Sequence, residues 1–332
     1  MASLLTTIPH TIFPYEIDYL KLSSDCATRI EMLLGGKTIL DTTLFPFGGF
    51  IELFNLSSLI IDCMEAEIKI LIIQIDGAEV ASTNVIPNTM DLDLPGTECF
   101  DIFLTRGTSK YTHPAAKEIL TYVDNGDSAA IITAVIRKEG KVTTTRKTLS
   151  LSSSGSGIVS LDVSPAVIFS IDDYDLIQYT VTMGSRSMTY RMIPDGMADT
   201  LHEYGFINSF MQEEYVTLMG EAERELKMER QHAYIGGQYQ NFQVLAIPHW
   251  TIKAILPDGM EGVFDDLVTS KEVWRKDDFC RMAITDSKNV TLSSSSAINE
   301  GSITLRETGR TYRHRPVRPV KTFDETFDDT FQ

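Results

Sequence analysis

The stretch EIKILIIQID at residues 67–76, followed by Gly77 and by AEVASTNV at residues 78–85, decides the fold class. It is rich in isoleucine, and β-branched side chains fit the pleated surface of a strand. An Asp-Gly pair between two such runs is typical of a tight hairpin turn, because both turn residues then adopt positive φ angles. The sequence therefore predicts a β-hairpin over residues 67–85.

The same pattern recurs outward from this hairpin. Short β-prone runs meet at Gly35-Gly36, Glu139-Gly140 and Gly184-Ser185. Closely spaced strands with such turns are typical of antiparallel sandwiches, whereas a doubly wound parallel sheet would need helices between the strands. We predict a mainly β fold of about two to three antiparallel β-sandwich-like domains with about one or two short helices, in which strand exceeds helix by at least about two to one.

Individual segments give more specific expectations. Residues 114–123 are predicted as a helix, because a proline starts the segment and its apolar residues fall on one side. Residues 99–105 and 263–268 are predicted as strands. Residues 221–230 contain strong helix formers, but without a clear apolar stripe, so a helix and a long charged strand both stay open there.

Turn-forming residues suggest the domain boundaries. Clusters at residues 124–127 and 194–196 divide the chain into an N-terminal β domain (1–125), a central β domain or extension (126–194), a C-terminal β domain (195–309) and an extended C-terminal arm (310–332). The low-complexity segment SSSGSG at residues 152–157 is read as a long hairpin loop or a linker.

Composition excludes several classes of protein. The 332 residues include 46 acidic and 29 basic side chains, a formal net charge of −17, and a nucleic-acid partner is not expected because phosphate backbones require a basic face. No apolar run reaches the roughly 20 residues of a membrane helix, so no membrane partner is expected either. Residues 1–5 have neither a basic segment nor a long apolar one, and no secretory signal is expected.

The search for chemistry yields no active site. The four cysteines are widely spaced and the six histidines are scattered, so neither a disulfide framework nor a metal or cofactor site is expected. The acidic run Asp172-Asp173-Tyr174-Asp175 offers oxygen ligands for calcium but lacks the glycine and trailing glutamate of an EF-hand, which favours a plain acidic turn. Asp265-Asp266 is a second acidic cluster. Glycosidases use paired carboxylates, but a chain with 46 acidic residues presents such pairs by chance, and we expect that the protein is not an enzyme.

The sequence of the C-terminal arm is regular. A basic stretch that includes Arg313, Arg315 and Arg318 is broken by prolines and precedes a repeat with Phe323, Phe327 and Phe331 at a spacing of four residues. A solvated tail is the ordinary interpretation of such charge runs. Even spacing, however, places the three rings on one face of a strand, and the same spacing lines one face of a helix. We expect the arm to dock on a neighbouring subunit, on another partner or on the protein's own body, with strand addition favoured by the Thr before each Phe.

Two segments carry a resemblance to a known group of proteins. Residues 206–216, FINSFMQEEYV, are followed by residues 233–243, AYIGGQYQNFQ. Together with the Thr-Phe-Asp repeats of the tail, they resemble tail-associated structural proteins of phages and prophages of anaerobic gut bacteria. Met211 departs from the pattern, because those proteins have a glycine at this place.

The resemblance implies a β-rich virion protein, of the tail tip, the baseplate or another tail-associated part, that is assembled in the host cytoplasm. Its partners would be copies of itself and other virion proteins. The alternative function is a receptor-binding or carbohydrate-binding β-sandwich at a particle tip, with a host-surface glycan as ligand. Trp250 and Trp274, the only tryptophans, would then be its stacking platforms.

Overall fold

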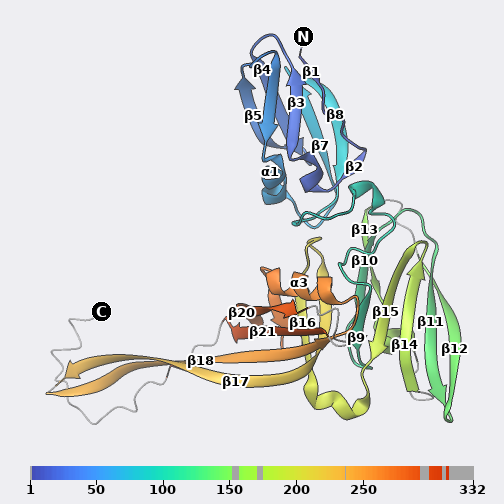
Figure 1. The fold of residues 1–332 in the computed structure, drawn as a ribbon, viewed down its shortest axis with the longest axis vertical. Helices are drawn as coiled ribbons and strands as arrows, with labels where there is room; N and C mark the ends of the chain where they lie inside the picture. The colour runs from blue at the N-terminus through green and yellow to red at the C-terminus, as the bar shows by residue number, and fades with distance from the viewer. Residues whose placement is uncertain are drawn as a thin grey trace.

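The computed structural model describes residues 2–151, 157–169, 175–235, 237–291, 299–308 and 312–313. Strands make up 56% of it and helices are short, which confirms the predicted mainly β class. Three groups of sheets follow one another along the chain (Figure 1).

The N-terminal group consists of two facing sheets. One has the strand order β2-β8-β7-β4-β5 and the other β1-β3-β6. The elements are β1 (Ser3–Leu4), β2 (Thr11–Ile12), β3 (Tyr19–Ser23), β4 (Thr28–Leu34), β5 (Lys37–Leu44), β6 (Phe50–Phe54), α1 (Leu56–Cys63), β7 (Lys69–Ile75) and β8 (Ala78–Val85).

The predicted hairpin is confirmed as β7 and β8. Asp76 and Gly77 have φ angles of 50° and 81°, so both turn residues have the positive φ that the tight hairpin requires. Leu71, Ile73 and Ile75 alternate into the core between the two sheets, while Ile70 points outward. Alternation of this kind fixes which face of the sheet is buried.

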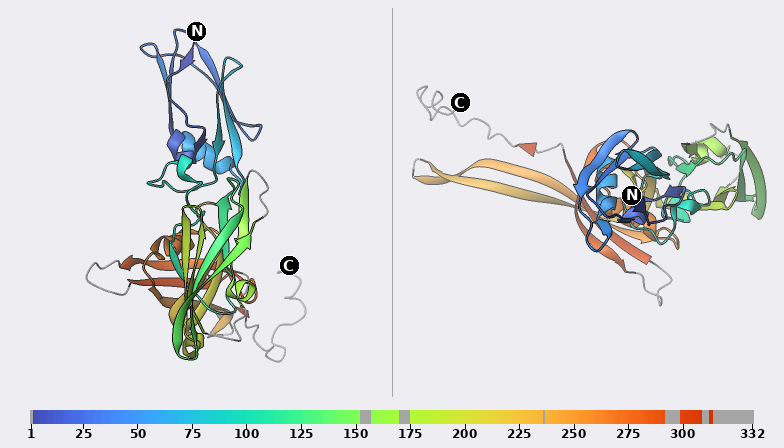
Figure 2. Two further views of the ribbon diagram at one scale, coloured as in Figure 1. Left: turned by 90° about the vertical axis from the view of Figure 1, so that its right-hand side faces the viewer. Right: turned by 90° about the horizontal axis from the view of Figure 1, so that it is seen from above.

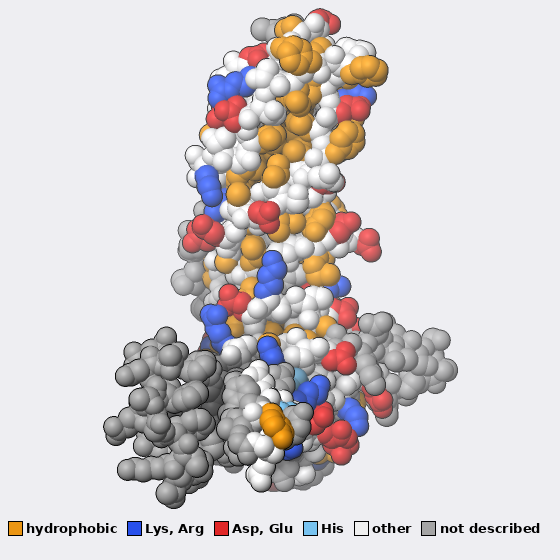
Figure 3. Space-filling view, turned by 90° about the vertical axis from the view of Figure 1, so that its left-hand side faces the viewer, with side chains coloured by type: hydrophobic (Ala, Val, Ile, Leu, Met, Phe, Trp, Pro, Cys, Tyr) orange, Lys and Arg blue, Asp and Glu red, His pale blue; other side chains and the backbone are white. Residues whose placement is uncertain are grey.

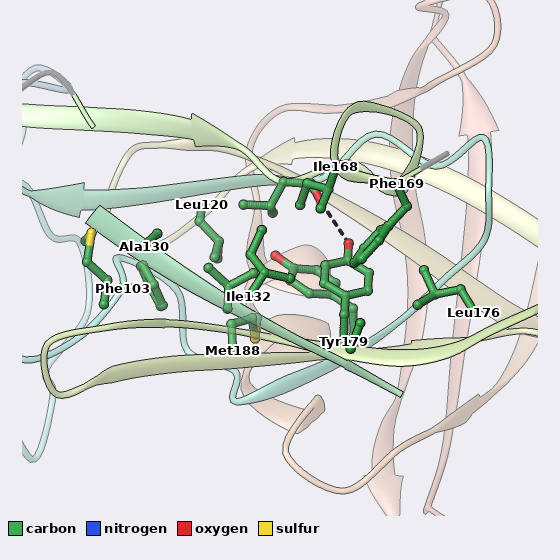
Figure 4. Packing of buried hydrophobic residues seen from close by; sticks show 14 of the residues in the cluster. Phe103, Leu120, Ala130, Ile132, Ile168, Phe169, Leu176, Tyr179 and Met188 are labelled. Carbon is green, nitrogen blue, oxygen red and sulfur yellow. Dashed lines mark hydrogen bonds between the residues drawn. The ribbon is translucent and has the colours of Figure 1, made fainter. Parts of the chain in front are cut away.

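The central group is a five-stranded sheet of order β12-β11-β14-β15-β9, covered by the pair β10-β13. Its elements are β9 (Ser109–Thr112), β10 (Ile119–Val123), β11 (Ala129–Lys138), β12 (Lys141–Ser150), β13 (Ile158–Asp162), α2 (Pro165–Ile168), β14 (Asp175–Met183) and β15 (Arg186–Met192). In the core, Tyr179 stacks on Tyr190 at 4.8 Å between ring centroids and donates a hydrogen bond of 2.8 Å to the carbonyl of Val163 (Figure 4).

The boundary between the first and second groups of sheets does not lie at residue 125. Strands β9 and β10 lie before that residue, yet β9 pairs with β15 and β10 pairs with β13. The change from the first group to the second falls between Val85 and Ser109. The division into separately folding domains remains a prediction.

The third group is a closed barrel of six strands. Its elements are β16 (Leu201–Ile207), β17 (Glu213–Ile235), β18 (Gln238–Leu256), α3 (Glu261–Thr269), β19 (Val273–Arg275), β20 (Arg281–Thr291) and β21 (Asn299–Glu307), with the short β22 (Tyr312–Arg313) beside β18. The order β17-β16-β19-β20-β21-β18 closes because β17 also pairs with β18. Helix α3 contributes Val263, Phe264 and Leu267 to the barrel core.

Three segment assignments are wrong. Residues 114–123 do not form a helix, because residues 120–123 are buried on both sides as strand β10, and this packing overrides the helical pattern. Residues 263–268 lie in helix α3 and not in a strand, since Val263, Phe264 and Leu267 are buried at helical spacing. Residues 99–105 form turns after a short 3₁₀ helix (Gly96–Glu98).

The N-terminal group stands above the other two, and a long ribbon projects sideways from the barrel (Figures 1 and 2). A small core of Phe13, Ile86, Leu104, Val123 and Phe210 joins all three groups. Among the described helices, none is long and apolar enough to cross a membrane.

Candidate functional site

The candidate site for contact with another chain is the outer part of β17 and β18, here called the ribbon (residues 220–235 and 238–254), which starts in the barrel wall and projects from it. The strands have 23 and 19 residues, and their inner ends belong to the barrel, where Leu218, Ile252 and Ala254 are fully buried. Beyond the Glu225–His249 pair the ribbon leaves the barrel (Figure 2). At about 3.3 Å per residue, its free length is about 30 Å.

The two faces of the ribbon differ in chemistry. Residues that face each other across an antiparallel pair lie on the same side of the sheet. One side therefore carries the pairs Arg224–Trp250, Leu226–Pro248 and Met228–Ala246. This apolar face continues the inner face of the barrel. Leu226 and Met228 of β17 are 46% and 53% exposed, whereas Pro248 and Ala246 of β18 are buried.

The opposite face is acidic at the root of the ribbon, but farther out it carries the pair Lys227–Ile247. It carries Glu221, Glu223 and Glu225, all exposed, opposite Lys253, Thr251 and His249. Lys253 Nζ lies 3.0 Å from a carboxylate oxygen of Glu223. A ribbon that only spans solvent would be polar on both faces, so the apolar face needs another explanation.

The β17 edge of the ribbon is open, whereas β21 and β22 cover parts of the β18 edge. Within the described residues, β17 pairs with β16 only as far as Met219, and beyond that point its one partner is β18. Strand β21 covers β18 from His249 to Leu256. A two-stranded ribbon is marginally stable alone, and its unpaired edge groups are a template for another strand.

The root of the ribbon, where β17 and β18 leave the barrel (residues 220–225 and 249–254), is held firmly. Gly220 has no room for a side chain, since a Cβ there would lie 1.9 Å from the carbonyl oxygen of Lys253. Two guanidinium groups lie near the ring of Trp250, Arg224 at 5.8 Å and Arg275 at 5.9 Å from the ring centre. Arg275 is itself paired with Asp278 at 2.7 Å and with Glu307 at 3.1 Å. The direction in which the ribbon leaves the barrel is therefore fixed by packing.

The C-terminal arm approaches the same ribbon. The backbone of β22 pairs Tyr312 with Ala246 and Arg313 with Leu245, so the chain runs outward along β18 at this point. Arg315, Arg318, Phe323, Phe327 and Phe331 lie outside the described residues. Docking of the arm in cis or in trans stays a prediction.

The tryptophans are not open platforms. Trp274 packs against the Cα of Gly205 and meets Tyr215 edge-on at 6.3 Å, and Trp250 is half-buried at the root of the ribbon. A sugar ring stacked on either indole would have to displace these neighbours.

A buried polar cluster, which the sequence analysis missed, connects the central sheet to the barrel. Lys110 of β9 and Glu214 of β17 are buried and 2.5 Å apart, and Lys110 also donates to the carbonyl of Tyr215 at 3.0 Å. Thr105 and Asn208 each donate to Glu214 at 2.7 Å. Every group in the cluster has a structural partner, which explains why a lysine and a glutamate tolerate burial.

The acidic runs have different environments. Asp266 is buried and accepts hydrogen bonds from Ser209 and Arg106. Burial raises the pKa of its carboxyl, and these hydrogen bonds lower it by less. Asp172 and Asp173 lie outside the described residues, and Asp175 begins β14 on the surface. Where the structure is described, no three His, Cys, Asp or Glu side chains are placed to hold a metal ion.

Comparison with known proteins adds little. No family model matches the chain, and no curated protein matches it. A crystal structure of the calcium-binding domain CBD12 of CALX1.1 aligns with 55% of this chain and 79% of that one, at 10% identity and a TM-score of 0.17. A TM-score this low supports no inference about fold or calcium binding in this chain.

Proposed function

We propose that this protein is a structural subunit of a phage tail, in the tail tip, the baseplate or another tail-associated part. It assembles there with copies of itself and with other virion proteins. The observation that carries the proposal is the ribbon, which combines an exposed apolar face with an open strand edge on a firmly packed root. An element of this kind gains stability when a second chain covers it, through both apolar burial and backbone pairing. The phage context comes from the sequence resemblance.

Deleting the ribbon tests the proposal directly. Replacing residues 226–248 with Asn-Gly closes the Glu225–His249 pair with a two-residue turn and leaves the barrel intact. We expect the full chain to elute as an oligomer in size-exclusion chromatography with light scattering, and the shortened chain as a folded monomer. Near-ultraviolet circular dichroism checks that the barrel has kept its packing.

Matched point variants separate the two faces. Leu226→Ser with Met228→Ser removes the apolar face, and we expect it to weaken self-association at least about tenfold, since each side chain buries apolar area in the contact. Glu223→Gln with Glu225→Gln keeps the size of the side chains on the opposite face and removes two negative charges, so it should not weaken association. A full chain that stays monomeric at high concentration, or equal effects of the two double variants, would contradict the proposal.

Truncation after Val320 tests the arm separately. The proposal expects the truncated chain to stay folded and to assemble more weakly, because three Phe side chains are lost from the contact. If it assembles as well as the full chain, the arm is a passive extension and the ribbon alone carries assembly.

A further inference from the structure

The outer hairpin of the central sheet, formed by β11 and β12, is a basic surface on an acidic chain. Residues 129–150 carry five basic side chains and one acidic side chain, all of them exposed, although the whole chain has a formal net charge of −17. The basic side chains are those of Arg137, Lys138, Lys141, Arg146 and Lys147. The face from which the ribbon projects, by contrast, shows acidic and basic side chains side by side (Figure 3). The hairpin therefore fits an acidic partner.

Strand β12 is also the end of its sheet. The strand order is β12-β11-β14-β15-β9, so within the described part of the chain β12 pairs with β11 alone and its other edge is open. All of its ten residues except Leu149 are exposed. Lysine and arginine on an edge strand oppose pairing with a second copy of the same edge, because like charges would then meet. They leave the edge open to a strand that carries acidic side chains.

The end of this chain has that composition. Residues 322–331, TFDETFDDTF, contain four acidic residues and no basic residue, and the segment has the same length as β12. An extended strand would place Asp324 and Asp328 on one side, and Glu325 and Asp329 on the other side together with the phenylalanines. Acidic groups would therefore be presented on both sides of such a strand.

Strand β12 offers cations on both of its sides. Arg146 lies on the outer face of the sheet, whereas Lys147 lies opposite the buried Ile132 on the inner face. Lys147 Nζ donates to the carbonyl of Ile168 at 2.5 Å, so helix α2 lies beside the inner face at this edge. Val167 of α2 is 62% exposed. Phenylalanines on the inner side of an added strand would thus meet an uncovered apolar side chain.

The arm starts in a direction that leads away from β12 of its own molecule. At Arg313 the chain runs outward along the ribbon, and β12 lies on the side of the molecule away from the ribbon (Figures 1 and 2). The 19 residues after Arg313 can span up to about 60 Å at about 3.3 Å each, which is enough to reach a neighbour beyond the ribbon.

We propose that residues 322–331 of one copy add as a strand to the open edge of β12 in a neighbouring copy. The inference rests on the proposed self-assembly and names the surface that receives the arm. A contact between two different surfaces of the same chain is heterologous, so it repeats from copy to copy and closes into a ring if the rotation allows.

The experiment maps where the arm binds. A full chain with the photoreactive analogue benzoylphenylalanine in place of Phe327 is co-expressed with a tagged full chain that lacks the analogue. After irradiation and purification through the tag, mass spectrometry locates the cross-linked residues. We expect the analogue of one copy to be joined to β12 or α2 of the tagged copy. Cross-links that map to the ribbon, or that form only within one chain, would overturn the inference.

Charge reversal tests the pairing itself. Lys141→Glu with Arg146→Glu in the tagged chain should lower the yield of this cross-link about tenfold, because like charges then face each other. Asp324→Lys with Asp328→Lys in the chain that carries the analogue should restore the yield, which a merely misfolded hairpin would not allow.

Lys37→Glu with Lys271→Glu in the tagged chain is the matched control. Both lysines are exposed and lie outside the central group, so the same change in net charge should leave the yield within about twofold. An unchanged yield in the β12 variant, a missing rescue or an equal loss in the control contradicts the inference. An oligomer whose cross-links map elsewhere overturns this inference alone, whereas a chain that stays monomeric in light scattering overturns the proposed function as well.

Discussion

Glu118 shows how strongly the junction between the central sheet and the barrel controls individual side chains. It is fully buried, and neither carboxylate oxygen has a hydrogen-bond partner among the described residues. Burial raises its pKa from about 4.5 to about 8, and the nearby charge of Lys110 and hydroxyl of Thr112 lower it by less. Glu118 is therefore mostly protonated in the folded protein at neutral pH.

This raised pKa makes folding stability depend on pH. In the unfolded chain the carboxyl loses its proton near pH 4.5, while in the folded protein it keeps the proton to about pH 8. Its contribution to stability is thus complete below pH 4.5 and is lost as the pH rises through 8, by up to about 5 kcal/mol. We expect Glu118→Gln to flatten this dependence in urea unfolding between these limits. An unchanged slope in the variant would show that other groups cause it.

The pair Lys110–Glu214 belongs to the same junction. Lys110→Met leaves Glu214 buried without its cation, and we expect a loss of about 3–5 kcal/mol in the free energy of unfolding. Lys253→Met, which breaks the exposed pair with Glu223, is the control and should cost less than about 1 kcal/mol. Equal losses in chemical denaturation would mean that the buried pair is not the link between sheet and barrel.

At the scale of the elements, Gly220 determines how β17 and β18 approach each other. Gly220→Ala places a methyl group against the carbonyl of Lys253, and we expect it to lower the thermal midpoint and to weaken assembly by shifting the ribbon. Gly196→Ala is the control, because a Cβ at Gly196 meets no atom within 4 Å. If both variants behave like the parent chain, β17 and β18 can shift at the root of the ribbon to accommodate the methyl group without loss of stability or assembly.

The elements also show which structure is readable from sequence. The hairpins were predictable, since Asp76-Gly77 and Glu139-Gly140 supply the positive φ angles that the turns use. The even spacing of Ala222, Leu226 and Met228 was the signal for a strand with one apolar face, although strong helix formers obscured it. The Lys110–Glu214 contact joins residues far apart in the chain, and no local pattern reveals such a pairing.

For the whole molecule, charge opposes assembly. Each copy carries a formal net charge of −17, so copies repel one another at long range. If the apolar face of the ribbon is the main contact, we expect self-association to strengthen as salt rises from about 0.02 to 0.2 M, because screening weakens the repulsion. Light scattering across this range provides the measurement. Weaker association in salt would instead indicate that basic groups of the arm meet the acidic face.

The unbroken passage of β17 and β18 from barrel to ribbon has a mechanical consequence. Hydrogen bonds in an antiparallel pair run across the strands, so tension applied along the ribbon loads in shear the bonds that join β17 to β16 and β18 to β21. These bonds then share the load and do not break one at a time. Force on the far end of the ribbon would reach the barrel wall directly, without passing through a hinge, and the molecule would resist pulling along this axis far better than pulling across it.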